Sequence, residues 1–213
     1  MAVILLLDTS IEMQSALGTS AAITGVTSTN PVVVTSANSF SGGEIVVLKA
    51  PGGLVELDNL QVRVANPTGT TFECEGLDGT TLGTYTSGGT VEEVTTFTAF
   101  NNATSFNFPE PNPNRIDVTT INRTTKVEVF GLDDAPQITI PMNASPLDPH
   151  VLEMRKASLS KTDRVFRVTL QNGNVLIFNG GVAGGRGLDG SVGAVATASC
   201  SVTLSANEQW FVS

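Results

Sequence analysis

Residues 164–179 read RVFRVTLQNGNVLIFN, and this stretch decides the fold class of the chain. Two apolar-rich runs, 164–171 and 175–179, flank the dipeptide Asn172-Gly173. Asn-Gly is the pair that a type I′ turn prefers, because both turn residues need a positive φ. The stretch therefore predicts a β-hairpin and indicates that the chain is built mainly from strands.

The sequence after this hairpin predicts a loop and a further strand. Residues 180–193 (GGVAGGRGLDGSVG) are rich in glycine, which is typical of a flexible loop. Residues 194–204 (AVATASCSVTL) alternate, so that Thr197 and Ser199 share one face while Ala198 and Cys200 share the other. We expect the more polar face to meet solvent or a wet channel.

Upstream of the hairpin, the sequence predicts more strands and one helix. Strand patterns occupy residues 115–121, 125–130 and 137–140. A helix begins near Pro149, with Ser145 or Asp148 as its cap, and continues towards Ser158; His150 in its first turn is expected at the surface. The segment 101–114 (NNATSFNFPEPNPN) reads as an exposed connector, because asparagine and proline suit neither strands nor helices.

The middle of the chain, residues 21–100, differs in composition from the rest. It holds eight acidic residues against Lys49 and Arg63. Short apolar runs separated by glycine and proline predict strands at residues 31–35, 44–49, 61–65, 71–75 and 90–95. This spacing is typical of a small β-barrel or sandwich.

Composition excludes several classes of function. Twenty acidic and 11 basic residues give a net charge of −9, which disfavours a nucleic-acid binder that neutralises phosphates. One His, one Tyr and one Trp leave few groups for acid–base chemistry, and Cys74 and Cys200 lack metal-ligand spacing. We therefore expect no enzymatic activity, no metal and no cofactor. The apolar run at residues 2–7 is too short for a signal peptide or a membrane span, so we expect no membrane partner.

The order of these segments resembles a known family. The run RIDVTTINRTTKVEVFGLDDAPQITIP (115–141), the helix after Pro149 and the Gly-turn hairpin resemble the major tail tube proteins of long-tailed bacteriophages. Residues 8–17 (DTSIEMQSAL) resemble the first strand of the same core. Separately, the segment from ITGVTSTNPVVVTSA (23–37) to TYTSGGTVEEVT (84–95) resembles a small β-barrel related to the first catalytic cysteine half-domain of ubiquitin-activating enzymes, which recurs in phage virion proteins without enzymatic activity.

The resemblance implies a mainly β fold with two parts. A tail-tube-type β-sandwich or barrel core with one short α-helix would comprise residues 1–21 and 98–213, and an inserted small β-barrel would comprise residues 22–97. The implied function is that of a structural virion protein, assembled in the host cytoplasm, whose stacked hexameric rings hold the tape-measure protein and conduct the genome. The implied partners are other copies of the chain, the tape-measure protein, and the tail terminator and tail tip proteins. DNA would pass through without specific binding.

The acidic excess supplies the candidate functional residues. Either it keeps a β-rich surface soluble, or some of Glu12, Asp117 and Glu128, which lie in expected core strands, line the channel. An alternative function is a phage or bacterial surface module that binds a carbohydrate or a receptor through the barrel. The aromatic residues of that segment, Phe40, Phe72, Tyr85 and Phe97, are scattered along the sequence, which disfavours this alternative.

Overall fold

The computed structural model describes residues 7–110 and 113–212, and the fold is mainly β. The apolar run at residues 2–7 lies outside the described residues except for Leu7. In chain order the strands are β1 (Ser10–Leu17), β2 (Ala21–Val26), β3 (Val32–Ser36), β4 (Ile45–Lys49), β5 (Gln61–Ala65), β6 (Thr71–Cys74), β7 (Thr90–Ala99), β8 (Pro113–Asp117), β9 (Glu128–Asp133), β10 (Gln137–Asn143), β11 (Asp163–Thr169), β12 (Val175–Gly184), β13 (Thr197–Leu204) and β14 (Gln209–Phe211). A 3₁₀ turn, η1 (Val55–Leu57), and one helix, α1 (Pro149–Ser160), complete the described elements.

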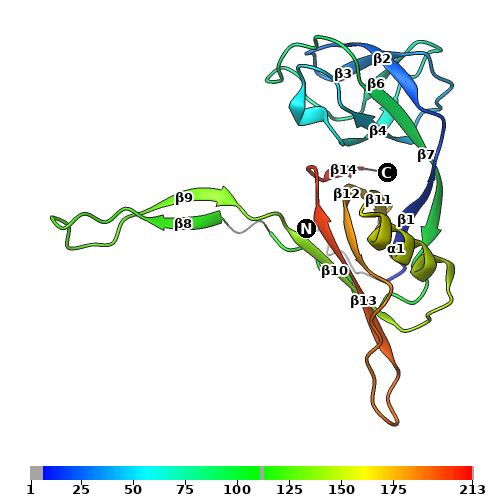
Figure 1. The fold of residues 1–213 in the computed structure, drawn as a ribbon. Helices are drawn as coiled ribbons and strands as arrows, with labels where there is room; N and C mark the ends of the chain where they lie inside the picture. Colours follow the sequence, from blue (N-terminus) through cyan, green and yellow to red (C-terminus); the bar gives the residue numbers. More distant parts are fainter. Residues whose placement is uncertain (1–6, 111–112, 213) are drawn as a thin grey trace.

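Strands β2 to β7 form the small barrel expected from the middle segment. Their order is β7-β2-β3-β6-β5-β4, and β4 pairs with β7 to close the circle. Alternate side chains of these strands point inward and fill the barrel, among them Val34, Leu48, Val62, Phe72 and Cys74. The barrel occupies the top of Figure 1, above the rest of the chain.

Strands β1 and β10 to β13, together with β7, form a core sheet in the order β10-β13-β12-β11-β1-β7, and β14 pairs with β12. Apolar side chains from this sheet pack together with one face of α1 in a second hydrophobic cluster, which includes Met13, Ile140, Met154, Phe166 and Phe178. Strand β7 belongs to both parts. Its first four residues pair with β4, and its last residues pair with β1.

The hairpin predicted at residues 164–179 is confirmed, but its turn differs from the predicted type. β11 and β12 pair from Asp163↔Gly181 to Thr169↔Val175. Of the two turn residues only Gly173 has a positive φ, of 85°, whereas Asn172 accepts a hydrogen bond from the Asn174 backbone N–H through its side-chain oxygen. The turn is therefore not type I′, which needs a positive φ at both residues. A hydrogen bond from the backbone to the Asn172 side chain stabilises it instead.

The glycine-rich segment after this hairpin is only partly a loop. β12 continues to Gly184, and Gly180 pairs with Leu204 of β13. A Cβ atom at Gly180 would lie 2.3 Å from the Thr203 carbonyl oxygen, so the glycine allows the two strands to approach. The expectation of a flexible loop from residue 180 was wrong, since close packing rather than flexibility requires glycine here. β13 alternates as expected, with Cys200 and Val202 buried.

Helix α1 begins where its sequence predicts and ends at Ser160, slightly beyond the expected end near Ser158. Pro149 occupies the first turn, Asp148 is the N-cap residue, and Lys161 ends the helix with a left-handed φ of 52°. His150 is fully buried and lies 5.2 Å from the Phe100 ring, so the expectation that it lies at the surface was wrong. The helix packs its first turn against the sheet, which turns His150 inward.

Two further expectations need correction. The segment 101–114 is not simply an exposed connector, because residues 102–107 hydrogen-bond along β10 and Phe106 and Phe108 pack against Phe178; residues 111–112 lie outside the described part. Among the described strands, β8 and β9 pair only with each other, so Asp117 and Glu128 do not lie in core strands. They form an arm that extends away from the body of the molecule, to the left in Figure 1.

Candidate functional site

Glu12 lies in the core sheet and is matched by a positive charge. It stands between Arg167 of β11 and Ala99 of β7 in the strand register. The Arg167 guanidinium donates a hydrogen bond through Nε to Glu12 Oε2 at 2.7 Å, and its Nη2 lies 2.6 Å from the same oxygen as an ion pair. The guanidinium carbon lies 4.3 Å from the centroid of the Phe97 ring. The neighbouring Met13 is buried on the α1 side, so Glu12 lies on the sheet face away from the helix.

Asp117 and Glu128 lie opposite each other on the arm. Lys126 bonds to Glu128 and lies 4.0 Å from Asp117, and Arg115 lies 3.5 Å from Glu128. Hydrogen bonds from Thr119 hold the pKa of Asp117 below its usual value, and the bond from Lys126 does the same for Glu128. These bases relieve the repulsion between two carboxylates directly across a strand pair.

The structure thus brings two of the three candidate acids together and separates them from the third. Asp117 and Glu128 share the arm, whereas Glu12 lies in the core sheet. Whether these residues line a channel depends on neighbouring copies and stays a prediction.

The arm itself was not expected from the sequence. Its large apolar side chains are exposed, and no other strand in the described part of the chain pairs with β8 or β9. They are Ile116, Val118, Ile121, Val129, Phe130 and Leu132. A projecting apolar ribbon of this kind marks an interaction surface. The sequence signal was the threonine-rich stretch at residues 118–125 (VTTINRTT), in which apolar and polar residues do not alternate as in a core strand.

The core sheet has different edges at its two ends. Along β10, segment 102–107 covers the edge with backbone hydrogen bonds. Along β7, β4 pairs with Thr90–Glu93, and in the described part of the chain no strand follows it beside residues 95–99. An uncovered edge presents unpaired backbone groups and is a template for another strand.

The barrel and the core sheet meet at an interface, called the joint below, that combines apolar and polar contacts. A third cluster joins Ile45, Val47 and Val94 to Val165 and Ile177. Beside this cluster, Asn59 donates to Asp163 at 2.6 Å and Asn179 donates to the Asn59 carbonyl at 2.9 Å. Arg63 also stacks 4.2 Å from the Phe211 ring centroid. These contacts hold the two parts in one orientation.

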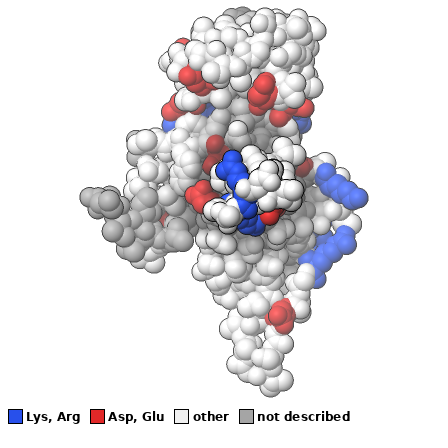
Figure 2. All heavy atoms as spheres, turned by 90° about the vertical axis from the view of Figure 1, so that its left-hand side faces the viewer, with Lys and Arg blue, Asp and Glu red and all other residues white. Residues whose placement is uncertain are grey.

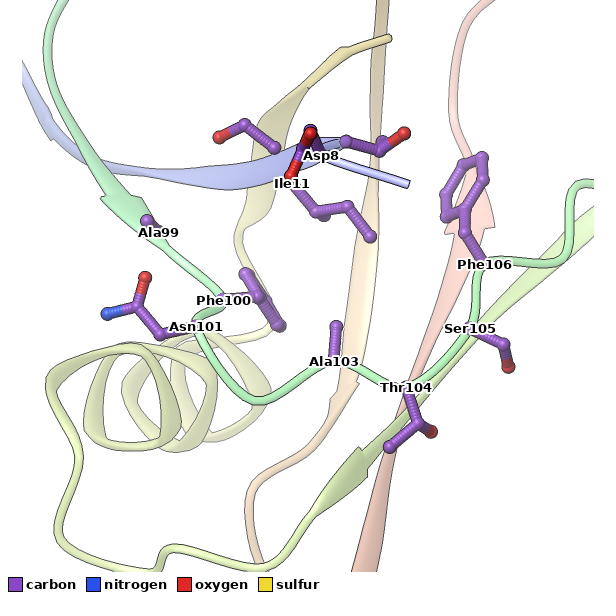
Figure 3. A pocket seen from close by; sticks show the side chains of 11 residues that line it. Asp8, Ile11, Ala99, Phe100, Asn101, Ala103, Thr104, Ser105 and Phe106 are labelled. Atoms are coloured by element: carbon purple, nitrogen blue, oxygen red, sulfur yellow. The ribbon is translucent and has the colours of Figure 1, made fainter. Parts of the chain in front are cut away.

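A hollow of about 520 Å³ lies beside the start of β1 (Figure 3). Ile11, Phe100 and Phe106 supply apolar surface, while Asp8 is the one titratable group among the described residues that line it. General acid–base or nucleophilic chemistry needs paired groups, and this hollow does not supply them.

Other reactive groups are isolated or buried. Burial raises the pKa of the Cys74 and Cys200 thiols to about 12, so both behave as apolar side chains. Among residues 7–110 and 113–212, no group of three or more His, Cys, Asp or Glu side chains is placed to hold a metal ion. The described residues also contain no helix that is long and apolar enough to cross a membrane.

The aromatic side chains Phe40, Phe72 and Tyr85 of the barrel pack or form hydrogen bonds within the fold. Phe72 is buried, and Phe40 packs edge-on against it at 5.4 Å. The Tyr85 hydroxyl donates to the Ile23 or Gly88 carbonyl, each at 2.9 Å. These rings do not form an exposed platform of the kind that binds sugars.

Comparison with known proteins supplies the family. Residues 52–210, which are more than half of the chain, match the family model described as phage tail tube protein, TTP. The match begins inside the barrel and ends within β14. No individual curated protein is significantly similar to the sequence. The fold agrees with this family, which is structural and not enzymatic. The chain therefore belongs to the phage tail tube protein family and is a structural component of the virion tail.

Proposed function

We propose that copies of this chain form stacked hexameric rings whose lumen holds the tape-measure protein and later conducts the genome into the host. The chain would be the major subunit of the tube and would assemble in the host cytoplasm. The tail terminator and tail tip proteins would cover the two ends of the stack, because a column of identical rings leaves one unpaired surface at each end.

One observation carries this proposal. The core sheet has the projecting arm at its β10 side and the open edge of β7 at its other side, as Figure 1 shows. Surfaces that differ on the two sides of a subunit favour head-to-tail contacts, which close into a ring when the rotation between neighbouring copies completes a full turn. Ring closure would pair the open edge and cover the apolar arm.

The lumen wall is the second part of the proposal. We keep Glu12, Asp117 and Glu128 as candidate lumen residues. Glu12 supports the assignment because it lies on the sheet face that α1 does not cover. A net charge of −9 would repel phosphates, so DNA would slide without specific binding.

The third part concerns the domains. We propose that residues 1–21 and 98–213 form the tube core and that residues 22–97 are an inserted barrel. The separate hydrophobic clusters of the barrel and the core sheet support this division. The joint between them supports a barrel held rigidly on the core rather than tethered loosely.

Negative-stain electron microscopy of the purified chain tests the assembly. We expect rings or tubes with a central channel and six-fold symmetry in averaged end views. Monomers at high protein concentration would contradict the proposal, and another symmetry would contradict the hexamer alone.

A further inference from the structure

We propose that the β8–β9 arm of one copy docks along the open edge of β7, at residues 95–99, in a second copy, with Arg123 of the arm facing Glu44 and Glu93. This inference rests on the proposed self-assembly and specifies the contact that joins two copies. It defines a donor surface, an acceptor surface and the charges that align them.

The acceptor surface is the edge of β7 at residues 95–99, where β4 no longer pairs with β7. The pairing of these two strands ends at Val46↔Glu93, where β4 begins, and the chain before β4 is the loop at residues 41–44. β1 covers the opposite edge of β7 as far as Ala99. In the described residues, no backbone hydrogen bond reaches the β4 side of residues 95–99. Thr95 and Thr96 are exposed there, and an extended segment could continue the sheet.

A groove of about 590 Å³ adjoins this edge, and its unmatched charge is negative. It is lined by the loop at residues 41–45 and by residues 93–97. Within the groove, Glu12 and Arg167 match each other, whereas Glu44 and Glu93 have no ion-pair partner among the described residues. Burial and the charge of Glu44 both raise the pKa of Glu93, as expected for a carboxylate with no ion-pair partner of its own among the described residues.

The arm offers complementary charge. Its turn, residues 118–127, contains Arg123 and Lys126 and no acidic residue. Lys126 is engaged by Glu128, while Arg123 forms no ion pair within the described chain. Figure 2 looks along the arm and shows Lys and Arg at its near end, with Asp and Glu scattered over the barrel above. Opposite charges at the two surfaces set partner and orientation.

The arm also exposes apolar side chains that docking would bury. Ile121 at its turn is fully exposed, and Phe130 and Leu132 are mostly exposed. Docking on a second copy would bury part of this apolar surface and pair one strand of the arm with β7. The donor and acceptor lie on opposite sides of the molecule in Figure 1, so the contact is head-to-tail and cannot be satisfied within a closed two-fold dimer.

A charge-swap experiment tests the alignment. We expect Arg123→Glu and Glu93→Arg each to raise the protein concentration needed for assembly by about tenfold or more, measured by sedimentation at physiological salt. The double variant should assemble at close to the wild-type concentration. Combining Arg123→Glu with Glu56→Arg, an equal charge change at an exposed position of the barrel, should restore nothing.

Cross-linking tests the position independently of charge. Copies carrying Arg123→Cys, mixed with copies carrying Thr96→Cys and treated with a mild oxidant, should give a disulfide-linked dimer that neither variant gives alone. Cys74 and Cys200 are buried and will not compete. Thr70→Cys, an exposed position between β5 and β6, is the control acceptor and should give no dimer.

The outcomes separate this contact from the tube itself. Wild-type rings with no charge-swap rescue and no cross-link would overturn the docking and leave the proposed function standing. A wild-type chain that remains monomeric at all concentrations, with no cross-link in the mixture, would overturn both.

Discussion

Gln61 of the barrel donates a hydrogen bond from Nε2 to the carbonyl of Ile177 in the core sheet, at 3.3 Å. The same amide group donates to the Asn207 carbonyl at 2.7 Å. Gln61 is fully buried, and its bond to Ile177 is buried while its bond to Asn207 is partly buried. One side chain thus ties the first residue of β5 to β12 and to the segment before β14. These contacts hold the barrel and the core sheet in one relative orientation.

The first prediction concerns this amide. Gln61→Ala should lower the free energy of unfolding by about 1–3 kcal/mol, because it leaves two carbonyl groups in the joint without their donor. Urea unfolding of the unassembled chain measures the change. Gln137→Ala, at an exposed position of β10, should change stability by less than about 0.5 kcal/mol. Equal effects at both positions would show that the joint is not a site of stabilisation.

The second prediction tests the division into domains. Replacing residues 22–97 with a short Gly/Ser linker exposes the core half of the joint, including Val165, Ile177 and Phe211. We expect the shortened chain to aggregate, and a version with Val165→Thr and Ile177→Thr to remain soluble with a cooperative unfolding transition. Loss of cooperative folding in both versions would mean that the barrel is part of one indivisible unit.

The third prediction concerns the close approach of β12 and β13. Gly180→Ala should destabilise the chain by about 1–3 kcal/mol, because the new Cβ would meet the Thr203 carbonyl oxygen and the strands must shift. Thermal or urea unfolding measures the cost. Gly187→Ala is the matched control, since nothing lies within 4 Å of its added Cβ and its φ is not positive. Similar stability of the two variants would contradict the packing argument.

The sequence predicted those parts of the fold that local patterns specify. The hairpin at residues 163–184 follows from apolar runs around Asn172-Gly173, and the two faces of β13 follow from alternation. The barrel follows from short runs at regular spacing, and α1 follows from Pro149. Each strand, turn or helix signal is a run of about ten residues or fewer, where backbone preference and side-chain period act directly. The barrel was predicted from the repetition of such runs along residues 21–100.

Features that depend on distant contacts were missed. The strand pattern of β8 and β9 is real, but only tertiary structure shows that they leave the core sheet. His150 looked like a surface residue because its partner, Phe100, is 50 positions away in sequence. Gly180 looked like a loop glycine because Thr203, the residue that approaches it, is 23 positions away in sequence. For the site, the acids were identified but their separation into core and arm was not.

The fourth prediction uses the buried histidine. Burial lowers the pKa of His150, while the nearby Asp148 opposes this effect, and His150 Nε2 has no hydrogen-bond partner among the described residues. The unfolded chain therefore binds a proton more readily than the folded chain. Stability is fully present above the unfolded pKa of about 6.5 and falls as the pH drops below that value towards the folded pKa.

Urea unfolding between pH 7.5 and pH 5.5 measures this dependence. His150→Phe keeps a ring against Phe100 and removes the titrating group, so it should flatten the decline in stability over this range. Carboxylates are expected to contribute to the pH dependence of stability mainly below pH 5, so the range from pH 7.5 to pH 5.5 reports mainly on the histidine. An unchanged slope in the variant would assign the decline to another group.

The last prediction concerns the proposed lumen. Changing Glu12, Asp117 and Glu128 together to lysine should slow or trap genome delivery if these side chains face the channel, because a basic wall attracts the phosphates that an acidic wall repels. Screening limits this effect to about 10 Å at moderate salt, so it acts on DNA confined in the tube. Infectivity of virions with correctly assembled tails measures delivery.

The matched control separates charge from structure. Each of the three acids is paired, Glu12 with Arg167 and the other two with Lys126, so lysine substitution also breaks ion pairs. The triple variant Glu12→Gln, Asp117→Asn and Glu128→Gln breaks the same pairs without creating a basic wall. It should therefore assemble like the lysine variant while delivering the genome faster. Normal infectivity of the assembled lysine variant would place these residues outside the lumen, and tight duplex binding by the wild-type chain at physiological salt would contradict passage of DNA without specific binding.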